Sequence, residues 1–315
     1  MRINVWDGGK LREGSIDEVK SGLSKAVWYD IEDPSIDDMG QIADALAVPR
    51  HVLIGKLRSN YPHIDSYMEH TKIFAWYLDT KIKGKDITNN MGPIIIFTNG
   101  IGVVTIGHSW TKTGQRITSE LSAQRLIDRS LGFKIIYLTL THLLEAYEHF
   151  VEEFEITAEQ LEKKTPPWPK HLYQEAYELR REASSLLRLL HHFRLLMEQL
   201  TQDRSELKFS EDEKEVLDNI LERSVGAEET IDSTQESMRD LISLHMDTTN
   251  HEMNQTMRLI AALTVIVGVP SLISSLLGSN TLEHNLNLLQ QGLISLIAMI
   301  GIAIFFWLKG WLRIS

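Results

Sequence analysis

Residues 259–277 read LIAALTVIVGVPSLISSLL and contain no charged side chain. A helix of this length extends about 28 Å at ~1.5 Å per residue, close to the ~30 Å hydrocarbon core of a bilayer. A second apolar stretch follows at residues 291–308, with Trp307, Lys309 and Trp311 at its end. Two buried core helices are the alternative, but paired apolar stretches flanked by tryptophan and basic residues are typical of membrane spans. The sequence therefore predicts two C-terminal transmembrane helices.

The distribution of basic residues around the two spans predicts their orientation. The connecting segment, residues 278–290, has no Lys or Arg, whereas Arg258, Lys309 and Arg313 lie at the opposite ends of the spans. Basic residues collect on the cytoplasmic side of a membrane. We therefore expect a multi-pass protein of the cell (plasma) membrane, with an external loop at 278–290, a cytosolic tail at 309–315 and both termini in the cytoplasm.

The residues before the spans form an acidic, water-soluble part. Removing the three basic residues and one acidic residue of 258–315 from the chain's totals of 32 and 43 leaves 29 and 42. This balance argues against a nucleic-acid partner, which needs basic patches, and favours attraction of cations. The chain has no cysteine, which excludes disulfides and thiolate metal sites. It also lacks a nucleophile elbow, a phosphate loop and a zinc-protease motif, so we expect no enzyme.

Residues 1–130 alternate short apolar runs with turn residues, a pattern typical of an α/β domain. Strands are expected at residues 3–6, 26–31, 73–79, 94–98 and 102–106, and helices at residues 37–47 and 114–130. Asn99-Gly100, between the last two runs, predicts a hairpin turn.

From Leu131 the apolar spacing becomes helical, and it predicts helices at residues 132–164 and 170–201. A third helix is expected to begin at Ser210, because Glu213 three residues later completes a capping box. No strong breaker except Gly226 interrupts it before the first span, so this helix is expected to exceed 60 residues. The resulting regions are an α/β domain at 1–130, a helical stalk region at 131–257 and a transmembrane module at 258–315.

Two spans cannot enclose an ion path, so any pore must be shared by several subunits. Small and polar residues recur at a spacing of three and four along the end of the stalk and the first span: Asn254, Met257, Ala261, Thr264, Gly268, Ser271 and Ser275. Two interpretations of this face remain open, a pore lining and ordinary helix packing, since small and hydroxyl residues also favour packing in membranes. The second span is almost wholly apolar and is expected to face lipid.

Several motifs occur in an order that resembles a known family. They are NQTMR at Asn254–Arg258, VPSLISSLLGSN at Val269–Asn280 and FWLKGWL at Phe306–Leu312, with WYDIEDP at Trp28–Pro34 and YPHIDSY at Tyr61–Tyr67 upstream. Together they resemble the CorA family of Mg²⁺ channels and its ZntB-like zinc-transporting relatives, whose first span carries a mid-helix proline and ends in Gly-Met-Asn. The resemblance covers nearly the whole chain.

The resemblance implies an α+β cytosolic funnel domain (an α/β/α sandwich), long stalk helices and two C-terminal transmembrane helices, assembled as a homopentamer in membrane lipid. It implies passage of a divalent cation, with Asn280, Gly278 and Ser279 forming the ion-selectivity site and Glu283 and His284 at the outer mouth. Asn254 would add a second polar ring, and Met257 with Ala261 an apolar constriction that gates by dewetting. No cofactor is expected apart from the transported ion, which could also act as a regulator.

The middle Met of the family motif is Ser279 here. This departure leaves two ions open: Mg²⁺ influx driven by the membrane potential, or Zn²⁺ transport that could be coupled to protons, with Co²⁺ and Ni²⁺ as further substrates. A membrane-anchored coiled-coil scaffold without transport is a third reading, against which the polar face of the first span argues, because an anchor needs no such face.

Two groups of charged residues outside the spans are weaker candidates for metal binding. Asp212, Glu215 and Asp218 begin the stalk helix, and the resemblance implies a regulatory cation site there; a favourable interaction with the helix dipole is the alternative. His142 and Glu145 share a helix face with His149, for which a solvated polar surface is preferred to a metal site.

Overall fold

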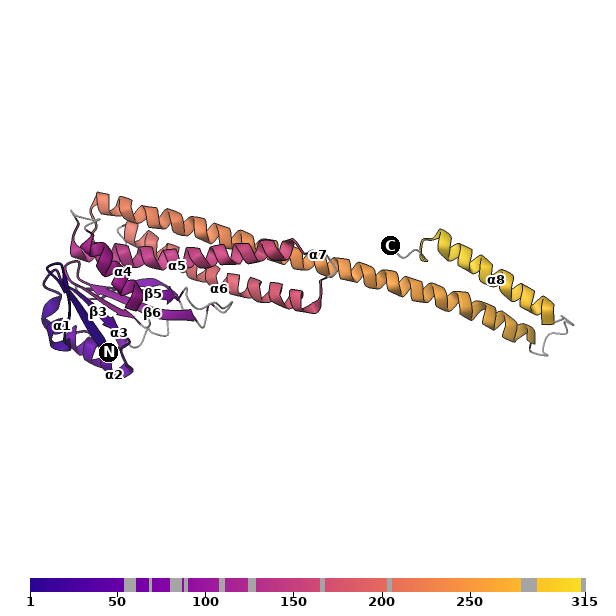
Figure 1. Cartoon of the computed structure of the whole chain (residues 1–315), viewed down its shortest axis with the longest axis horizontal. Helices are drawn as coiled ribbons and strands as arrows, with labels where there is room; N and C mark the ends of the chain where they lie inside the picture. The colour runs from indigo at the N-terminus through magenta and orange to yellow at the C-terminus, as the bar shows by residue number, and fades with distance from the viewer. Residues whose placement is uncertain are drawn as a thin grey trace. The chain divides into compact units, whose positions relative to one another are not determined.

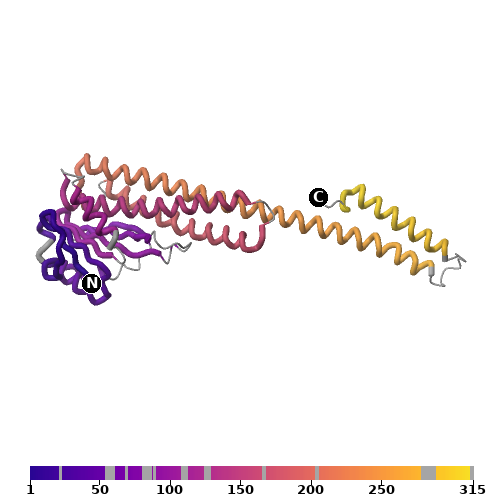
Figure 2. The backbone as a smooth tube through the Cα atoms, in the orientation of Figure 1, coloured from indigo at the N-terminus to yellow at the C-terminus, as the bar shows by residue number. Residues whose placement is uncertain are grey.

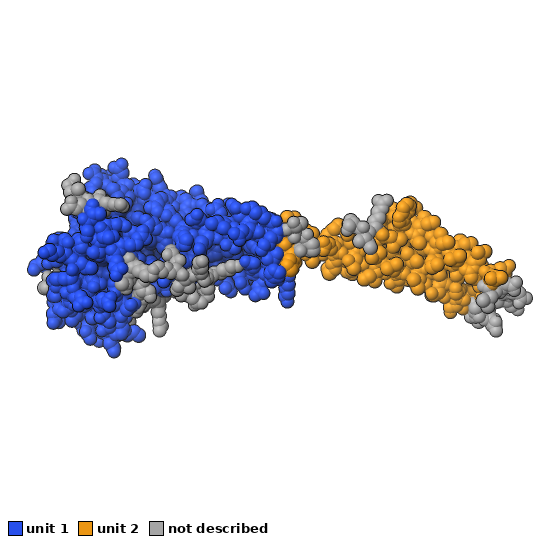
Figure 3. Space-filling view, viewed as in Figure 1, with its two compact units in different colours: residues 1–164, 170–240 blue, residues 165–169, 241–315 orange. Residues whose placement is uncertain are grey.

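The computed structural model describes residues 1–53, 61–67, 70–79, 87, 90–107, 111–123, 129–164, 168–202, 206–278 and 288–312 (Figure 1). Contacts divide the chain into two compact units (Figure 3). One comprises residues 1–164 and 170–240, and the other residues 165–169 and 241–315. The three regions expected from the sequence, with boundaries after residues 130 and 257, remain predictions.

A seven-stranded mixed sheet forms the centre of the first unit. Its strands are β1 (Arg2–Asp7), β2 (Lys10–Glu13), β3 (Trp28–Glu32), β4 (His63–Tyr67), β5 (His70–Leu78), β6 (Met91–Thr98) and β7 (Val103–Gly107), in the order β2-β1-β3-β7-β6-β5-β4. The β3–β7 pair is parallel, and every other pair in this order is antiparallel. The five expected strands are confirmed, and the two edge strands β2 and β4 are additions.

Helices cover both faces of this sheet. Successive strand residues point to opposite sides, so consecutive apolar residues form a core on each face. Ile95 and Phe97 of β6 join a core with α1 (Ile16–Gly22), α2 (Ile36–Ala45) and α3 (Arg50–Leu53). Ile94 and Ile96, equally buried, point to the other face, which the long helices cover (Figure 1). The expected α/β/α sandwich is therefore confirmed.

The predicted hairpin joins β6 to β7 through Asn99-Gly100. The Asn99 Oδ1 atom accepts hydrogen bonds from the backbone N–H groups of Ile101 and Gly102, each at 3.0 Å. Gly100 has φ 86°, a left-handed conformation that a residue without a side chain adopts easily. The same Asn99 side chain donates to the Leu23 carbonyl at 2.8 Å, so the turn combines local hydrogen bonds with a contact far away in the sequence.

The remaining helices are α4 (Thr111–Ser122), α5 (Leu131–Glu162), α6 (Lys170–Thr201), α7 (Glu211–Gly278) and α8 (Leu288–Leu308). The expected helix at 114–130 corresponds to α4, which ends at Ser122. Ser130 instead caps α5 by accepting a hydrogen bond from the Phe133 N–H at 3.2 Å. α7 is 68 residues long, which confirms the expected continuous helix. Figure 2 shows it as one unbroken tube.

The capping box predicted at the start of α7 is present. The Ser210 N–H donates to the Glu213 carboxylate at 3.0 Å, and the Glu213 N–H donates to the Ser210 hydroxyl at 3.3 Å. Each bond gives an acceptor to a backbone N–H group at the start of the helix, where no earlier turn supplies one. The start of the longest helix is therefore fixed by four residues of sequence.

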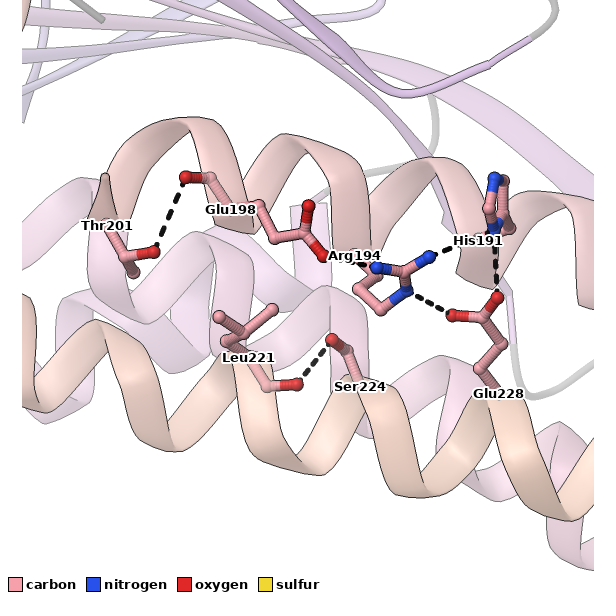
Figure 4. Close-up of polar contacts among 7 residues, drawn as sticks. All are labelled: His191, Arg194, Glu198, Thr201, Leu221, Ser224 and Glu228. Atoms are coloured by element: carbon pink, nitrogen blue, oxygen red, sulfur yellow. Dashed lines mark hydrogen bonds and ion pairs between the residues drawn. The ribbon is translucent and has the colours of Figure 1, made fainter. Parts of the chain in front are cut away.

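α5 and α6 pack on the first part of α7 and on the sheet. The buried Tyr147 hydroxyl of α5 donates to the Trp76 carbonyl of β5, and burial raises the pKa of Tyr147 above its ordinary range. Between α6 and α7, Glu228 accepts from the His191 ring at 2.8 Å and from the Arg194 Nε at 2.6 Å (Figure 4). These contacts hold the long helices as one bundle beside the sheet.

In the second unit, the segment before α6 contacts α7. Trp168 stacks on His245, with ring centroids 3.8 Å apart, and both side chains are buried. Beyond this contact the side chains of α7 from Met246 to Arg258 are exposed, except Thr248 and Gln255, which are half-buried.

Candidate functional site

Among the described residues, two helices are long and apolar enough to cross a membrane. Their ranges are Glu211–Leu277 and Leu289–Leu308, each with an 18-residue window of mean hydropathy 2.2. The share of the window that is buried by the rest of the chain is 11% for the first helix and 0% for the second. A core helix of a soluble protein would be mostly buried. The alternative of two buried core helices therefore does not fit the structure.

α8 packs against one face of α7. Ala262 is 0% exposed and Pro270 is buried, whereas Leu259, Ile266 and Ile273 are half-buried. These residues recur at a spacing of three and four, so they form one stripe along the helix. This stripe is the α8-facing side of the first span.

Two polar contacts join α7 to α8. The Ser274 and Ser295 hydroxyl oxygens are 2.7 Å apart, and the Gln291 side-chain amide donates to the Leu277 carbonyl at 3.3 Å. Hydrogen bonds of this kind stabilise helix pairs in lipid. Ser295, which stands out in an otherwise apolar span, therefore serves the contact between the two helices.

The face predicted to line a pore lies on the other side of α7. All seven of its residues are exposed: Asn254, Met257, Ala261, Thr264, Gly268, Ser271 and Ser275. At ~100° per residue their mean direction is about 180° from the stripe that contacts α8. The structure thus brings the seven residues onto one face, and it excludes packing of this face against the second span of the same chain.

The hydroxyl groups on this face are arranged as acceptors. Thr264 Oγ1 donates to the Ile260 carbonyl at 2.8 Å, and Ser271 Oγ donates to the Val267 carbonyl at 2.7 Å. Each hydroxyl proton is used within the helix, so the oxygen lone pairs remain for an outside donor. Water molecules around a cation are such donors, which makes this face chemically suited to a hydrated cation.

Gly268 leaves a gap in the middle of the same face. A Cβ atom added at Gly268 would meet nothing within 4 Å in the chain. The absence of a side chain is therefore unrelated to close packing within one subunit. Because Gly268 has no side chain and Ala261 has a small one, this part of the α7 face projects little beyond the helix backbone.

The predicted selectivity residues lie at the edge of what the structure describes. Gly278 is the last residue of α7. Ser279, Asn280, Glu283 and His284 lie outside the described residues. Their roles remain proposals that rest on the sequence.

The acidic residues at the start of α7 form no metal site with other residues that the structure describes. Asp212, Glu215 and Asp218 are exposed, and Asp212 lies 3.7 Å from Arg129 in an ion pair. Among the described residues no group of three or more His, Asp or Glu is close enough to hold a metal ion. The regulatory cation expected at this position remains a prediction.

His142 was expected on a solvated surface, and that expectation is wrong. Its side chain is buried, with Nδ1 3.0 Å from Glu145 and Nε2 3.3 Å from Glu120. His149 instead lies 3.7 Å from Glu153. Burial arises because α4 packs over this part of α5, which helical spacing in α5 alone does not reveal.

The chain matches a family model and a known transport protein over most of its length. A family model described as "CorA-like Mg2+ transporter protein" matches residues 24–309. The "Cobalt/magnesium transport protein CorA" of Methanocaldococcus jannaschii is 21% identical over 283 residues, which cover 88% of this chain and 87% of that protein.

Solved structures share the fold. The complete CorA magnesium transporter of Methanocaldococcus jannaschii superposes with a TM-score of 0.73 at 17% identity, covering 98% of this chain and 97% of that one. The ZntB cytoplasmic domain of Vibrio parahaemolyticus superposes with a TM-score of 0.63 at 14% identity, covering 79% of this chain and 98% of that one. The likeness extends over both units of the chain.

Proposed function

The chain belongs to the CorA-like family of Mg²⁺ transporter proteins, and from that premise we propose that it is a homopentameric channel for divalent cations, principally Mg²⁺. The observation that supports this proposal is the exposed polar face of α7, which lies opposite α8. Because the family is one of transporters, its membership also agrees with the expectation that the chain is not an enzyme.

The proposed path uses neutral oxygen atoms that can hold a hydrated cation without trapping it. Mg²⁺ loses water reluctantly, so a ring of Asn280 side chains would contact its water shell rather than the bare ion. Glu283 would raise the local cation concentration just outside this ring. Thr264 and Ser271 would accept from the same waters further along, and Met257 would form the apolar constriction before the ring of Asn254.

Inward movement through this path needs no chemical energy source. A divalent ion gains about 4.6 kcal/mol per 100 mV of inside-negative potential, twice the ~2.3 kcal/mol of a single charge. The proposed location is the plasma membrane, with both termini in the cytoplasm. The membrane potential alone then favours Mg²⁺ entry.

Zn²⁺ is the second candidate ion, and one feature favours it. Ser279 stands in place of the family's methionine, and His284 follows Glu283 in the same segment. Imidazole is a better ligand for Zn²⁺ than for Mg²⁺. The likeness to the ZntB cytoplasmic domain is one of fold and does not separate the two ions.

Purified protein reconstituted in liposomes is expected to take up Mg²⁺ when the lumen is held negative, and native mass spectrometry is expected to show a homopentamer. Both follow from a pore that several subunits share, since two spans cannot enclose one. Parallel assays with Zn²⁺, Co²⁺ and Ni²⁺, with and without a pH gradient, identify the preferred ion. Flux from a monomer or dimer would contradict the shared pore, and a pentamer that passes none of these ions would favour the scaffold.

Cysteine at Ser279 or Asn285 is expected to react with a membrane-impermeant thiol reagent added to intact cells, whereas cysteine at Ser315 is expected to react only after lysis. The parent chain has no cysteine, so it is an unlabelled control. The physical basis is the position of Arg258, Lys309 and Arg313 at the ends opposite the loop. Labelling at Ser315 from outside the cell would reverse the proposed orientation.

A further inference from the structure

α5 and α6 contact α7 on different flanks. Glu148 of α5 accepts two hydrogen bonds from Arg223, at 3.0 and 2.5 Å, whereas His191 and Arg194 of α6 contact Glu228 (Figure 4). Arg223 and Glu228 are five residues apart, which is about 140° around a helix. Each subunit therefore presents an α5 flank and an α6 flank on different sides of this part of α7.

The α5 flank is acidic. A groove of about 550 Å³ lies between α5 and α7, and its charged lining consists of Glu155, Glu159, Glu162 and Glu229. The other lining residues are small or carry hydroxyl groups, including Thr230 and Ser233. Lys163 forms an exposed ion pair with Glu159 at 3.3 Å but does not line the groove. We call these four carboxylates with their hydroxyl neighbours the acidic groove.

The α6 flank carries a basic depression on α6 itself. Tyr177, Arg180, Arg181, Ser184 and Arg188 line a depression of about 220 Å³, and none of the described residues that line it is a carboxylate. Arg188 is exposed and donates to the Ser185 hydroxyl at 3.1 Å. It also lines the groove between α6 and α7, together with Glu228, Glu229 and Asp232. Arg181 donates to the buried Glu182 at 3.0 Å. We call this surface the arginine patch; it stands out on a chain of formal net charge −11.

The height of the acidic groove along α7 follows from the α5 contact. α5 and α7 run in the same direction, because each is antiparallel to α6 (Figure 1). Glu148 is level with Arg223. Glu155, seven residues further along, is therefore level with Thr230, which lines the same groove.

The height of the arginine patch follows from the α6 contact. His191 is level with Glu228, and α6 runs against α7, so Arg188 three residues earlier is level with Ile231. Thr230 and Ile231 are adjacent, which places Glu155 and Arg188 at the same level to within about one helical turn, ~5.4 Å. Opposite charges thus lie at one height on opposite flanks.

We propose that the arginine patch of one subunit docks on the acidic groove of the next subunit. This inference rests on the proposed function, in which α7 lines the axis of a closed ring. Rotation about that axis changes no height, so a head-to-tail interface closes into a ring when its two complementary surfaces lie at the same level. Solvent-exposed ion pairs of this kind fix orientation and partner choice more than they add affinity.

The test uses two differently tagged chains expressed together, one with Glu155→Cys and the other with Arg188→Cys. A short bismaleimide is expected to join the two tags into one covalent species. Because the parent chain has no cysteine, each chain carries one cysteine and a mixed-tag product reports contact between subunits. The matched control replaces Glu155→Cys by Glu153→Cys, which is also exposed but lies about 200° around α5 from Glu155. The control pair is expected to give no mixed-tag product.

Charge reversal gives an independent readout. Arg180→Glu with Arg188→Glu is expected to lower the pentamer fraction severalfold at low salt, and adding Glu155→Arg with Glu159→Arg to the same chain is expected to restore it. The loss should shrink at high salt, where exposed charges are screened. Rescue by the second pair would exclude misfolding as the cause of the loss.

The outcomes separate this inference from the proposed function. If the parent forms a pentamer and transports cations, but the Glu155–Arg188 pair gives no mixed-tag product and charge reversal has no effect, the docking inference is wrong and the function stands. If the parent forms no oligomer, the shared-pore function fails and the interface fails with it.

Discussion

Gly268→Leu is expected to abolish cation flux while expression and oligomer size remain those of the parent. Gly268 lies on the exposed face of α7, and an added side chain meets nothing within 4 Å in the chain. Leucine is also a better helix former than glycine, by roughly 1 kcal/mol. The substitution therefore should not disturb the subunit, but a ring of leucine side chains at the axis would fill the path. The measurement is Mg²⁺ uptake into liposomes.

Gly301→Leu is the matched control for this prediction. Gly301 lies in α8, is exposed, and likewise has nothing within 4 Å of an added Cβ. Flux is expected to survive in this variant, since α8 is proposed to face lipid. Parent-like flux in Gly268→Leu would show that the path runs elsewhere. Loss of the oligomer in the same variant would instead show that this face packs against a neighbouring subunit.

Asn280→Ala is expected to reduce flux to background, again without loss of expression or of the pentamer. The proposed ring of amide oxygens binds the hydrated ion at the outer mouth, and alanine offers no oxygen to replace them. Asn280 is expected in the external loop, and a substitution at an exposed loop position usually changes the free energy of unfolding by less than about 0.5 kcal/mol. Uptake assays at saturating and limiting Mg²⁺ would measure the loss.

Asn285→Ala, in the same segment, controls for general effects of removing an amide. It is expected to transport like the parent, because no role in ion binding is assigned to Asn285. Should Asn280→Ala retain full flux, the selectivity site must be elsewhere and the mechanism implied by family membership would not apply here.

The elements that the sequence predicted well are those whose signals are local. α6 occupies the expected residues 170–201, and α7 begins at the expected capping box of Ser210 and Glu213. β2 (Lys10–Glu13) was missed because all its residues are exposed, so it lacks the alternation that marks a half-buried strand. Its existence depends on pairing with β1, which is a tertiary contact.

The candidate site also has features that local sequence signals predict and others that depend on tertiary contacts. Helical spacing alone predicted that Thr264, Gly268 and Ser271 share a face, and the structure confirms this placement. The position of α8 could not be predicted, because spacing within one helix does not say which neighbour covers which side. Similarly, Glu155 and Arg188 are far apart in the sequence, and only the register of the antiparallel helices places them at one height.

The exposed stretch of α7 from Met246 to Arg258 has a consequence for folding. An isolated helix of this length is marginal in water, since its backbone hydrogen bonds barely offset the loss of chain entropy. Thr248, Thr249 and Thr256 each bond to the carbonyl four residues earlier, but threonine is a weak helix former. Within one chain this stretch is therefore the segment of α7 most prone to helix–coil opening. Association of subunits would suppress that opening, so ordering of the stretch and assembly of the protein would become one coupled equilibrium.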